Sequence, residues 1–275
     1  MASATPPTLL DKVTNVSDFI WGGTWNGEQV LLFPPMVVLL LGVGAWLMIG
    51  LKFYPILNLP KAFAGLFKKD DEDKAGEISP FAALSTALSG QVGTGNLAGV
   101  ATAITLGGPG ALFWMWITAL LGMALAFAEG SLAIRYRIKG EDGQYRGGPM
   151  NYIRQGLGRN WGWLSVLFCI GLLFSSVATG NMIQANSFAD SVHSLTGWPD
   201  WVAGLIAAVA VFAVIIGGIK SIGGIAEKIV PFMALAYVTM AVIAIALNIE
   251  DLPGAFALII DSAFNGQAAA GGFLG

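Results

Sequence analysis

Seven long apolar runs constrain this chain of 275 residues more than any other feature. They cover residues 31–51, 78–106, 111–134, 163–186, 198–219, 229–247 and 254–275. Each is near or above the length of about 20 residues that an α-helix needs to cross a bilayer. Hydrophobic residues make up 55% of the chain and charged residues only 11%, a balance foreign to water-soluble domains. The sequence therefore predicts an all-α integral membrane protein with about seven transmembrane helices.

The distribution of charge predicts how these helices are oriented. Lysine and arginine gather in the connections after the first, third and fifth runs, and only Lys12 lies on the opposite side. That opposite side carries acidic residues instead, at positions 190, 200, 250 and 251. Cytoplasmic loops of membrane proteins are enriched in lysine and arginine. We therefore expect the basic connections in the cytoplasm and residues 1–30 outside it.

One run contains a stretch that is ill suited to a continuous helix. The sequence LSGQVGTGNLAGV, residues 88–100, places four glycines within ten residues, interleaved with glutamine, threonine and asparagine. Each interior glycine weakens a helix by up to about 1 kcal/mol relative to alanine. Irregular backbone at membrane depth is tolerated only where protein or a water-filled cavity surrounds it. The stretch therefore predicts a broken helix, with free carbonyls for a cation and free N–H groups for an anion.

Other interpretations of the polar residues are weaker. Gly95 and Gly99 form a G-x-x-x-G pair that would allow close helix packing, but the excess length and polarity of the run favour a break. Glu129 lies near a predicted cytoplasmic helix end, where pairing with Arg135 is favoured over proton coupling. His193 is the only histidine, and beside Ser194 in an outer loop it is expected to be solvated rather than catalytic.

Four segments carry a resemblance to a known family. The sequences LSGQVGTGNLAGVATAITLGGPGALFWMW, FAEGSLAIRYR, RGGPMNYIRQGLG and TGNMIQANSF resemble the alanine/glycine:cation symporters. The resemblance implies sodium-coupled import of alanine or glycine through the inner membrane of a prokaryotic cell. It also implies the inverted five-plus-five repeat fold of the leucine transporter with one extra N-terminal helix. Residues 31–275 would form the transporter domain, with the first repeat at about 78–248 and the second beginning at 254–275.

The same resemblance implies roles for residues in the glycine-rich stretch. The amides of Thr94 and Gly95 would hold the amino-acid carboxylate, and the carbonyls of Gly90 and Gln91 would face its ammonium group. The remaining implied contacts are Gly93 at the substrate, Asn96 and the Gln91 carbonyl at one sodium ion, and Ser89 and the Val92 carbonyl at a second. Apart from the resemblance, the glycine-rich segment 261–275 predicts a second broken helix, in which Phe273, flanked by glycines, would wall the substrate side chain. Phe264 and Ser262 are further candidates for the pocket wall. No cofactor is expected beyond the transported sodium.

Two further expectations complete the sequence-based account. The amphipathic centre of GGPMNYIRQGLG, residues 150–157, predicts a helix that lies in the membrane interface. The chain ends inside an apolar run, so we expect a longer protein whose C-terminal half is needed for full activity. The expected partners are the small amino acid, sodium and the lipid bilayer, and nucleic acid is not among them. The alternative to a symporter is a structural helix bundle or an intramembrane enzyme.

Overall fold

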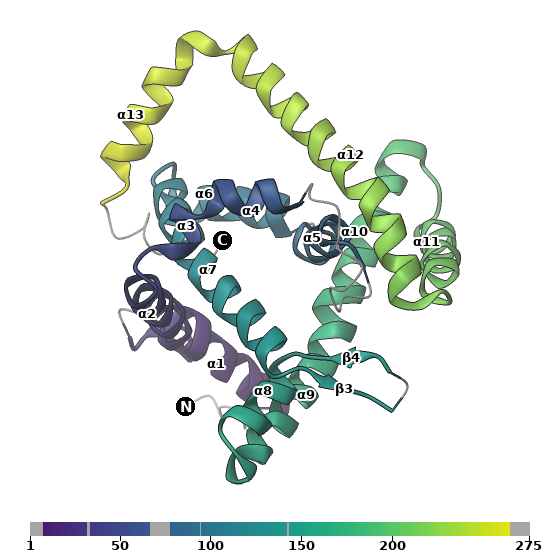
Figure 1. Cartoon of the computed structure of the whole chain (residues 1–275). Coiled ribbons are helices and arrows are strands. Elements are labelled where there is room, and N and C mark those ends of the chain that lie inside the picture. Colours follow the sequence, from purple (N-terminus) through teal and green to yellow (C-terminus); the bar gives the residue numbers. More distant parts are fainter. Residues whose placement is uncertain (1–7, 32–33, 67–77, 94, 142, 265–275) are drawn as a thin grey trace. The chain divides into compact units, whose positions relative to one another are not determined.

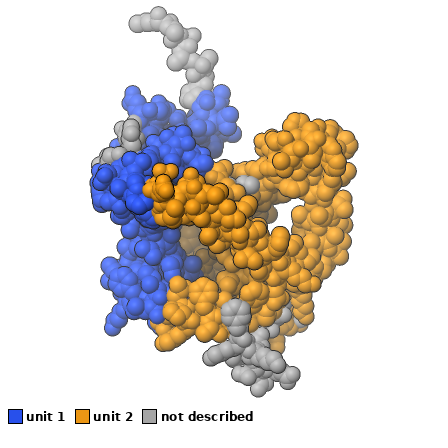
Figure 2. Space-filling view, turned by 90° about the horizontal axis from the view of Figure 1, so that it is seen from above, with its two compact units in different colours: residues 1–57, 99–128, 253–275 blue, residues 58–98, 129–252 orange. Residues whose placement is uncertain are grey.

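The computed structural model describes residues 8–31, 34–66, 78–93, 95–141 and 143–264 (Figure 1). The described residues are almost entirely helical, as the sequence predicts for an all-α membrane protein. They form two compact units, coloured separately in Figure 2, and each is described by itself. Unit 1 comprises residues 1–57, 99–128 and 253–275, and unit 2 comprises residues 58–98 and 129–252.

Unit 1 begins with an amphipathic helix that the sequence analysis did not predict. Helix α1 (Leu9–Gly22) starts at a capping box, in which the side chains and backbone of Thr8 and Asp11 bond each other, and it ends at Gly23 in the left-handed conformation. The remaining elements of the unit are β1 (Thr24–Trp25), β2 (Glu28–Gln29), α2 (Pro35–Gly50), α3 (Tyr54–Leu57), α6 (Val100–Gly107), the first part of α7 (Ala111–Arg135) and α13 (Leu252–Ser262).

Two close backbone approaches hold the helices of unit 1 together. A Cβ atom on Gly44 of α2 would lie 3.1 Å from the Leu121 side chain of α7, so any larger residue there would push the two helices slightly apart. At Gly110 a Cβ atom would lie 2.5 Å from the backbone of Ser262. Beside it, the indole N–H of Trp114 donates a hydrogen bond to the Ala263 carbonyl. The end of α13 is therefore fixed on the start of α7.

Unit 2 contains most of the remaining helices. It comprises α4 (Leu59–Leu66), α5 (Pro80–Gln91), the π-helix η1 (Gly95–Gly99) up to Ala98, the end of α7, β3 (Ile138–Lys139), β4 (Tyr145–Arg146), α8 (Pro149–Gly156), η2 (Arg159–Trp161), α9 (Gly162–Val177), the π-helix η3 (Ala178–Met182), α10 (Ile183–Thr196), α11 (Asp200–Ile215), α12 (Gly218–Leu247) and η4 (Ile249–Asp251). The predicted helix at residues 150–157 corresponds to α8.

Small residues let α5 pack along α12 in unit 2. The Cβ position of Gly223 on α12 lies 3.5 Å from Ile78 and 3.7 Å from Thr86. Ala82 and Ser85 are buried on α5, and Ala226 is buried on α12. Small side chains at a helix interface allow the backbones to approach and gain dispersion contacts, which is the usual packing mode in membranes. Figure 1 shows the two helices in contact at the lower half of α12.

Within the described part of the chain, three helical segments are long and apolar enough to span a membrane. They are Ala111–Arg135, Arg159–Thr196 and Gly218–Leu247, and the shorter apolar helices are Pro35–Gly50, Gly95–Gly107 and Asp200–Ile215. Among the described residues no large side chain is completely buried, and most leucine, isoleucine and phenylalanine side chains lie on the surface. Such a surface suits lipid rather than water. The exact number of spans stays a prediction, and the predicted run at 229–247 extends back to Gly218 as α12.

Candidate functional site

The helix at residues 80–107 is interrupted where its glycines cluster. Helix α5 starts with Pro80 behind the Ser79 cap and ends at Gln91, after which Val92 has extended dihedral angles (φ −86°, ψ 103°). Helical structure resumes at Gly95 as a π-helix and continues as α6 from Val100. The predicted break is therefore present in the backbone. None of the described glycines in it has a positive φ angle, so the break reflects weak helix propensity rather than a left-handed turn.

Asn96 caps the helical segment that follows the interruption. The Gly93 N–H donates to the Asn96 side-chain oxygen at 3.0 Å, and the Asn96 N–H donates to the Gly93 carbonyl at 3.1 Å. The two residues thus form the side-chain-to-backbone half of a capping box at the start of the new helix. The amide oxygen predicted to bind sodium is already a hydrogen-bond acceptor, and its second lone pair is the one left for an ion.

On the near side of the interruption, backbone carbonyls have lost their helical partners. Among the residues that the structure describes, none donates a hydrogen bond to the carbonyls of Gly90, Gln91 or Val92. The Ser89 hydroxyl donates to the Thr86 carbonyl at 2.7 Å, so its oxygen still has acceptor capacity. These are four of the five groups that the family resemblance assigns to the ammonium and sodium contacts, with Asn96 the fifth, and the four lie consecutively along the chain.

A second irregular helix meets the first. Helices α9 and α10 are joined by the π-helix Ala178–Met182, and π-helical turns inside α-helices occur frequently at functional sites. Gln184, two residues after this π-helix, places its side-chain amide against Gly93. A Cβ atom on Gly93 would lie 3.0 Å from its Nε2 and 3.2 Å from its Oε1. In the sequence, this contact of Gln184 with the interruption has no signal apart from the polarity of the side chain.

The surroundings of the interruption differ from the prediction in one respect. Ser89, Gly90, Gln91 and Asn96 are exposed, so the described residues do not enclose the break in a hollow. A Cβ atom on Gly90 or Gly95 would meet no described atom within 4 Å, which argues against helix packing as the reason for these glycines. Thr94 and Phe273 lie outside the described residues.

The candidate aromatic Phe264 has a structural role in unit 1. Its ring lies 5.6 Å from that of Phe113 and 6.3 Å from that of Trp114. The Ser262 hydroxyl donates to the Leu258 carbonyl within its own helix. The Phe264 ring therefore helps to fix the end of α13 on α7 in unit 1.

The predicted pairing of Glu129 with Arg135 is wrong. The described residues contain no ion pair between them, and the Arg135 guanidinium lies over the Tyr136 ring instead, 5.8 Å from its centroid. Residues six positions apart project from different faces of a helix, because neighbours on one face are three or four apart. Glu129 instead interacts electrostatically with Tyr152 of α8. Burial, and secondly the charge of Glu129, raise the pKa of the Tyr152 phenol above its usual value.

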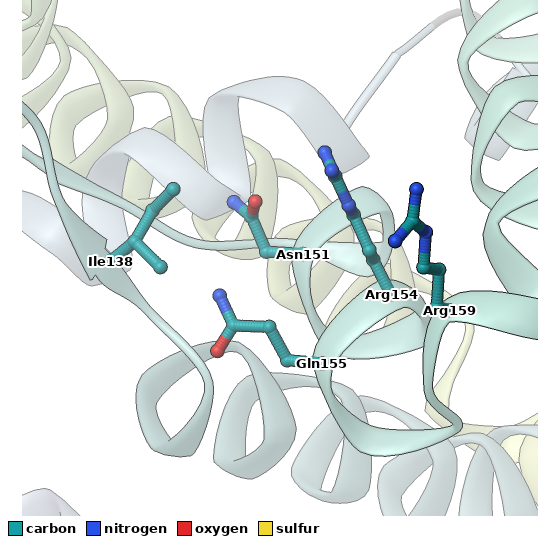
Figure 3. Close-up of a pocket in the computed structure, with 5 residues that line it drawn as sticks. All are labelled: Ile138, Asn151, Arg154, Gln155 and Arg159. Atoms are coloured by element: carbon teal, nitrogen blue, oxygen red, sulfur yellow. The ribbon is translucent and has the colours of Figure 1, made fainter.

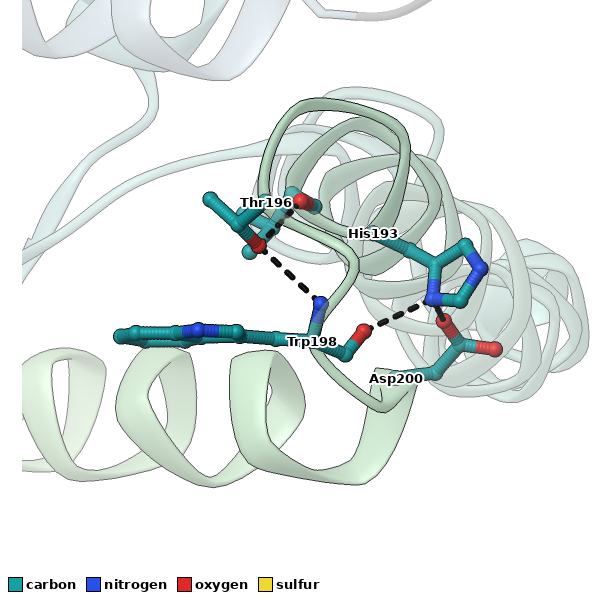
Figure 4. Close-up of polar contacts among 5 residues, drawn as sticks. His193, Thr196, Trp198 and Asp200 are labelled. Carbon is teal, nitrogen blue, oxygen red and sulfur yellow. Dashed lines mark hydrogen bonds and ion pairs between the residues drawn. The ribbon is translucent and has the colours of Figure 1, made fainter.

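His193 is largely exposed, as expected for a solvated side chain, but it lies in the last turn of α10 rather than in a loop. Figure 4 shows His193 joining the end of α10 to the start of α11. Its Nδ1 lies 2.7 Å from the Trp198 carbonyl and 3.6 Å from an oxygen of Asp200. The Trp198 N–H in turn donates to the Thr196 hydroxyl at 3.2 Å. These contacts fix a turn, and they offer no hydrolytic serine–histidine pair.

Comparison with known proteins now bears on this arrangement. A profile of the family described as "Sodium:alanine symporter family" matches residues 20–275, which is nearly the whole chain. The chain belongs to the sodium:alanine symporter family. This membership places the chain in a family of transporters rather than of enzymes, and it confirms the resemblance drawn from the four sequence segments.

Individual relatives of this symporter-family chain are similar over almost its full length. It is 44% identical to an uncharacterized transporter of Haemophilus influenzae over 98% of this chain and 56% of the relative. It is 45% identical to the sodium/alanine symporter AgcS of Methanococcus maripaludis over 97% of this chain and 57% of the relative. It is 43% identical to the putative sodium/proton-dependent alanine carrier protein YrbD of Bacillus subtilis over 90% and 50%. The chain thus spans about half the length of the curated relatives it matches.

Proposed function

We propose that this chain binds alanine or glycine together with sodium at the interruption between Gln91 and Gly95, as part of sodium-coupled import. The observation that carries the proposal is the row of backbone carbonyls at Gly90, Gln91 and Val92 that accept no hydrogen bond from a described residue. In a membrane each unpaired carbonyl costs several kcal/mol, so a chain retains such a row only where a ligand or cavity water satisfies it.

Both charged ends of an amino acid find a complementary group at this interruption. The carbonyls before the break carry partial negative charge and suit an ammonium group or sodium. The N–H groups at the start of the next helical segment, near Gly95, carry partial positive charge and suit a carboxylate. Gly93 and Thr94 would line the substrate between them, and Phe273 would cover its side chain. A zwitterion is therefore accommodated without any formally charged side chain.

Sodium would occupy oxygen cages beside the substrate. Asn96 and the Gln91 carbonyl would supply one cage, and Ser89 and the Val92 carbonyl would supply the other. Since the Asn96 oxygen already accepts from the Gly93 N–H at 3.0 Å, ion binding there would couple directly to the geometry of the break. Rocking of the helices that carry the break against the remaining helices would then expose the site alternately to each side. The excess of basic residues would place the N-terminus outside the cell.

A structural helix bundle is the competing function, and one observation weighs against it. In a helix bundle, glycines lie where another segment approaches too closely for a larger side chain, as at Gly44 and Gly110 in unit 1. Gly90 and Gly95 lie in open space among the described residues. Their purpose is therefore better explained by an accessible backbone than by packing.

Substitution of Asn96 tests the proposal. The purified chain in detergent is titrated with alanine by calorimetry, at low and at saturating sodium with choline as the replacing cation. Asn96→Ala removes an ion ligand and the cap, so we expect loss of the sodium dependence of alanine affinity. Asn96→Asp keeps an oxygen that can accept from Gly93 and bind sodium, and the dependence should survive.

Asn186→Ala is the matched control, since Asn186 is an exposed asparagine in α10 for which the described structure contains no side-chain hydrogen bond. It should bind alanine with the sodium dependence of the unmodified chain. Sodium dependence that is unchanged in Asn96→Ala would remove the ion site from this position.

A further inference from the structure

A hollow lined by two arginines lies at the end of unit 2 that holds α8. Its volume is about 490 Å³, within the range of about 300–1,000 Å³ typical of small-molecule sites. The lining residues are Ile138, Asn151, Arg154, Gln155 and Arg159, all shown in Figure 3. Two guanidinium groups and two carboxamides therefore surround one space, with a single apolar side chain at its edge.

The local sequence explains why these side chains converge. Asn151, Arg154 and Gln155 stand at positions i, i+3 and i+4 of α8, which share one face of a helix. Arg159 follows the tight turn at Gly158, whose φ of 91° favours glycine, and so returns toward that face. In Figure 3 both guanidinium groups extend toward the same rim of the hollow.

The surrounding backbone holds this face in place. The Asn151 side-chain amide donates to the carbonyls of Arg146 and Gly147, both at 3.1 Å. The Ser165 hydroxyl of α9 donates to the Met150 carbonyl at 2.7 Å. Since these bonds tie α8 to the hairpin on one side and to α9 on the other, the hollow is a fixed feature of the fold rather than a gap beneath a loose loop.

The positive charge of the hollow is not neutralised within the described part of the chain. Neither Arg154 nor Arg159 has an ion pair there, and none of the lining residues is acidic. A guanidinium group presents its N–H donors in a planar fork that matches two oxygens of a phosphate. Two such groups at one hollow, with the Gln155 amide nearby, form a site for a phosphate-bearing anion.

The position of the hollow in the sequence indicates which phosphate reaches it. Arg159 is the first residue of the candidate span Arg159–Thr196, and the preceding candidate span ends at Arg135. Trp161 and Trp163 stack at the start of that span, with ring centroids 6.4 Å apart. Tryptophans concentrate at the level of lipid headgroups, where they mark the membrane–water interface. The hollow therefore lies at headgroup level, on the side that carries the basic loops.

We propose that Arg154 and Arg159 bind the phosphate of an anionic phospholipid headgroup in this hollow. The chemistry is shared with free inorganic phosphate, but the interfacial position favours the lipid as the source. The site is separate from the interruption at Gln91–Gly95, so its occupation is independent of the proposed amino-acid site.

Native mass spectrometry of the detergent-solubilised chain tests this proposal. The protein is titrated with short-chain phosphatidylglycerol, with short-chain phosphatidylcholine and with inorganic phosphate, and bound copies are counted. We expect phosphatidylglycerol to bind in preference to both others. Arg154→Gln with Arg159→Gln should weaken the first phosphatidylglycerol by roughly 10- to 30-fold, since each arginine near a headgroup contributes about fivefold.

The control pair removes the same charge from the same connection. Arg135→Gln with Arg137→Gln alters two arginines that lie over tyrosine rings and do not line the hollow. An equal loss in both pairs would show diffuse attraction and overturn the site. Inorganic phosphate binding as tightly as the lipid would overturn the headgroup assignment.

A conservative pair guards against a folding defect in the glutamine variant. Arg154→Lys with Arg159→Lys keeps both charges but loses the planar fork, so an affinity between those of the unmodified and glutamine chains is expected. Affinity unchanged from the unmodified chain would contradict the role of the guanidinium groups.

Discussion

At the scale of single residues, Gly93 and Gln184 are the pair on which the interruption depends most directly. Gly93 leaves the space that the Gln184 amide fills, and its N–H is held by Asn96. Because Gln184 of one irregular helix contacts Gly93 of the other, a substitution at Gly93 should change the position of Gln184, and the reverse. Contacting residues usually show non-additive effects when both are substituted.

Gly93→Ala should weaken alanine binding about tenfold. The new Cβ atom would lie 3.0 Å from the Gln184 Nε2, and displacing one well-placed amide costs about 1–1.5 kcal/mol. In a double-mutant cycle with Gln184→Ala, measured by calorimetry at saturating sodium, the two losses should not add. Gly171→Ala, whose Cβ meets no described atom within 4 Å, is the matched control. Strictly additive losses would show that the contact has no influence on binding.

Tyr152 gives a prediction about pH. Burial, followed by the Glu129 charge, raises the pKa of its phenol above the usual value of 10.0. The folded state therefore binds the phenolic proton more tightly than the unfolded state does. The contribution of protonated Tyr152 to the free energy of unfolding is complete below pH 10 and is lost as the pH rises above that value. Ultraviolet titration of the phenolate, with Tyr152→Phe as the difference reference, should show this late step. Glu129→Gln should move it toward the usual value without reaching it, since burial remains.

At the scale of elements, the two membrane helices with π-helical segments share one design. In each, a polar stretch interrupts regular hydrogen bonding, at Gln91–Gly99 in one and at Ala178–Met182 in the other. A π-helical turn amounts to one residue more than an α-helix accommodates, so it changes the direction in which all later side chains project. The orientation of Gln184 toward Gly93 therefore depends on η3.

Insertion of one alanine after Val177 should abolish sodium-dependent alanine binding while the chain stays helical. Since η3 already holds one residue more than a regular helix, a further residue rotates Gln184 by about 100° relative to α9. Circular dichroism should be unchanged and calorimetric alanine binding lost. Gly180→Ala is the control, because it keeps the residue count and its Cβ would meet the Ser175 carbonyl oxygen at an ordinary 3.7 Å. Full binding by the insertion variant would show that the site does not depend on the orientation of Gln184.

At the scale of the whole molecule, the apolar surface identifies the bilayer as solvent. Large hydrophobic side chains lie outward along nearly every long helix, while buried positions are mostly occupied by alanine, glycine and serine. In lipid, outward apolar side chains carry no cost, and close packing of small residues supplies the attraction between helices. A sparse core is thus the expected result for this composition.

Binding of sodium and of alanine should be reciprocally linked in the whole protein. If both occupy the interruption, the factor by which saturating sodium raises alanine affinity must equal the factor by which saturating alanine raises sodium affinity. Two calorimetric series, one for each ligand, measure these factors independently. Equal factors well above one are expected, and a factor of one in either series would contradict a shared site.

The sequence by itself determined the membrane class, the family and the location of the helix break. Each of these depends on local composition: long apolar runs require lipid, and glycine with polar residues at 88–100 cannot sustain a regular helix. The amphipathic helix α8 was predictable for the same reason, since its periodicity is visible within eight residues.

Only the tertiary structure decided which distant residues meet. The contact of Gln184 with Gly93, the position of Phe264 against Phe113, and the interaction of Glu129 with Tyr152 join residues far apart in the chain. The convergence of Arg154 and Arg159 depends on a turn at Gly158 and on hydrogen bonds from a neighbouring helix. Periodicity specifies which face of a helix is apolar or polar, but the partner of that face is set by packing of the whole chain.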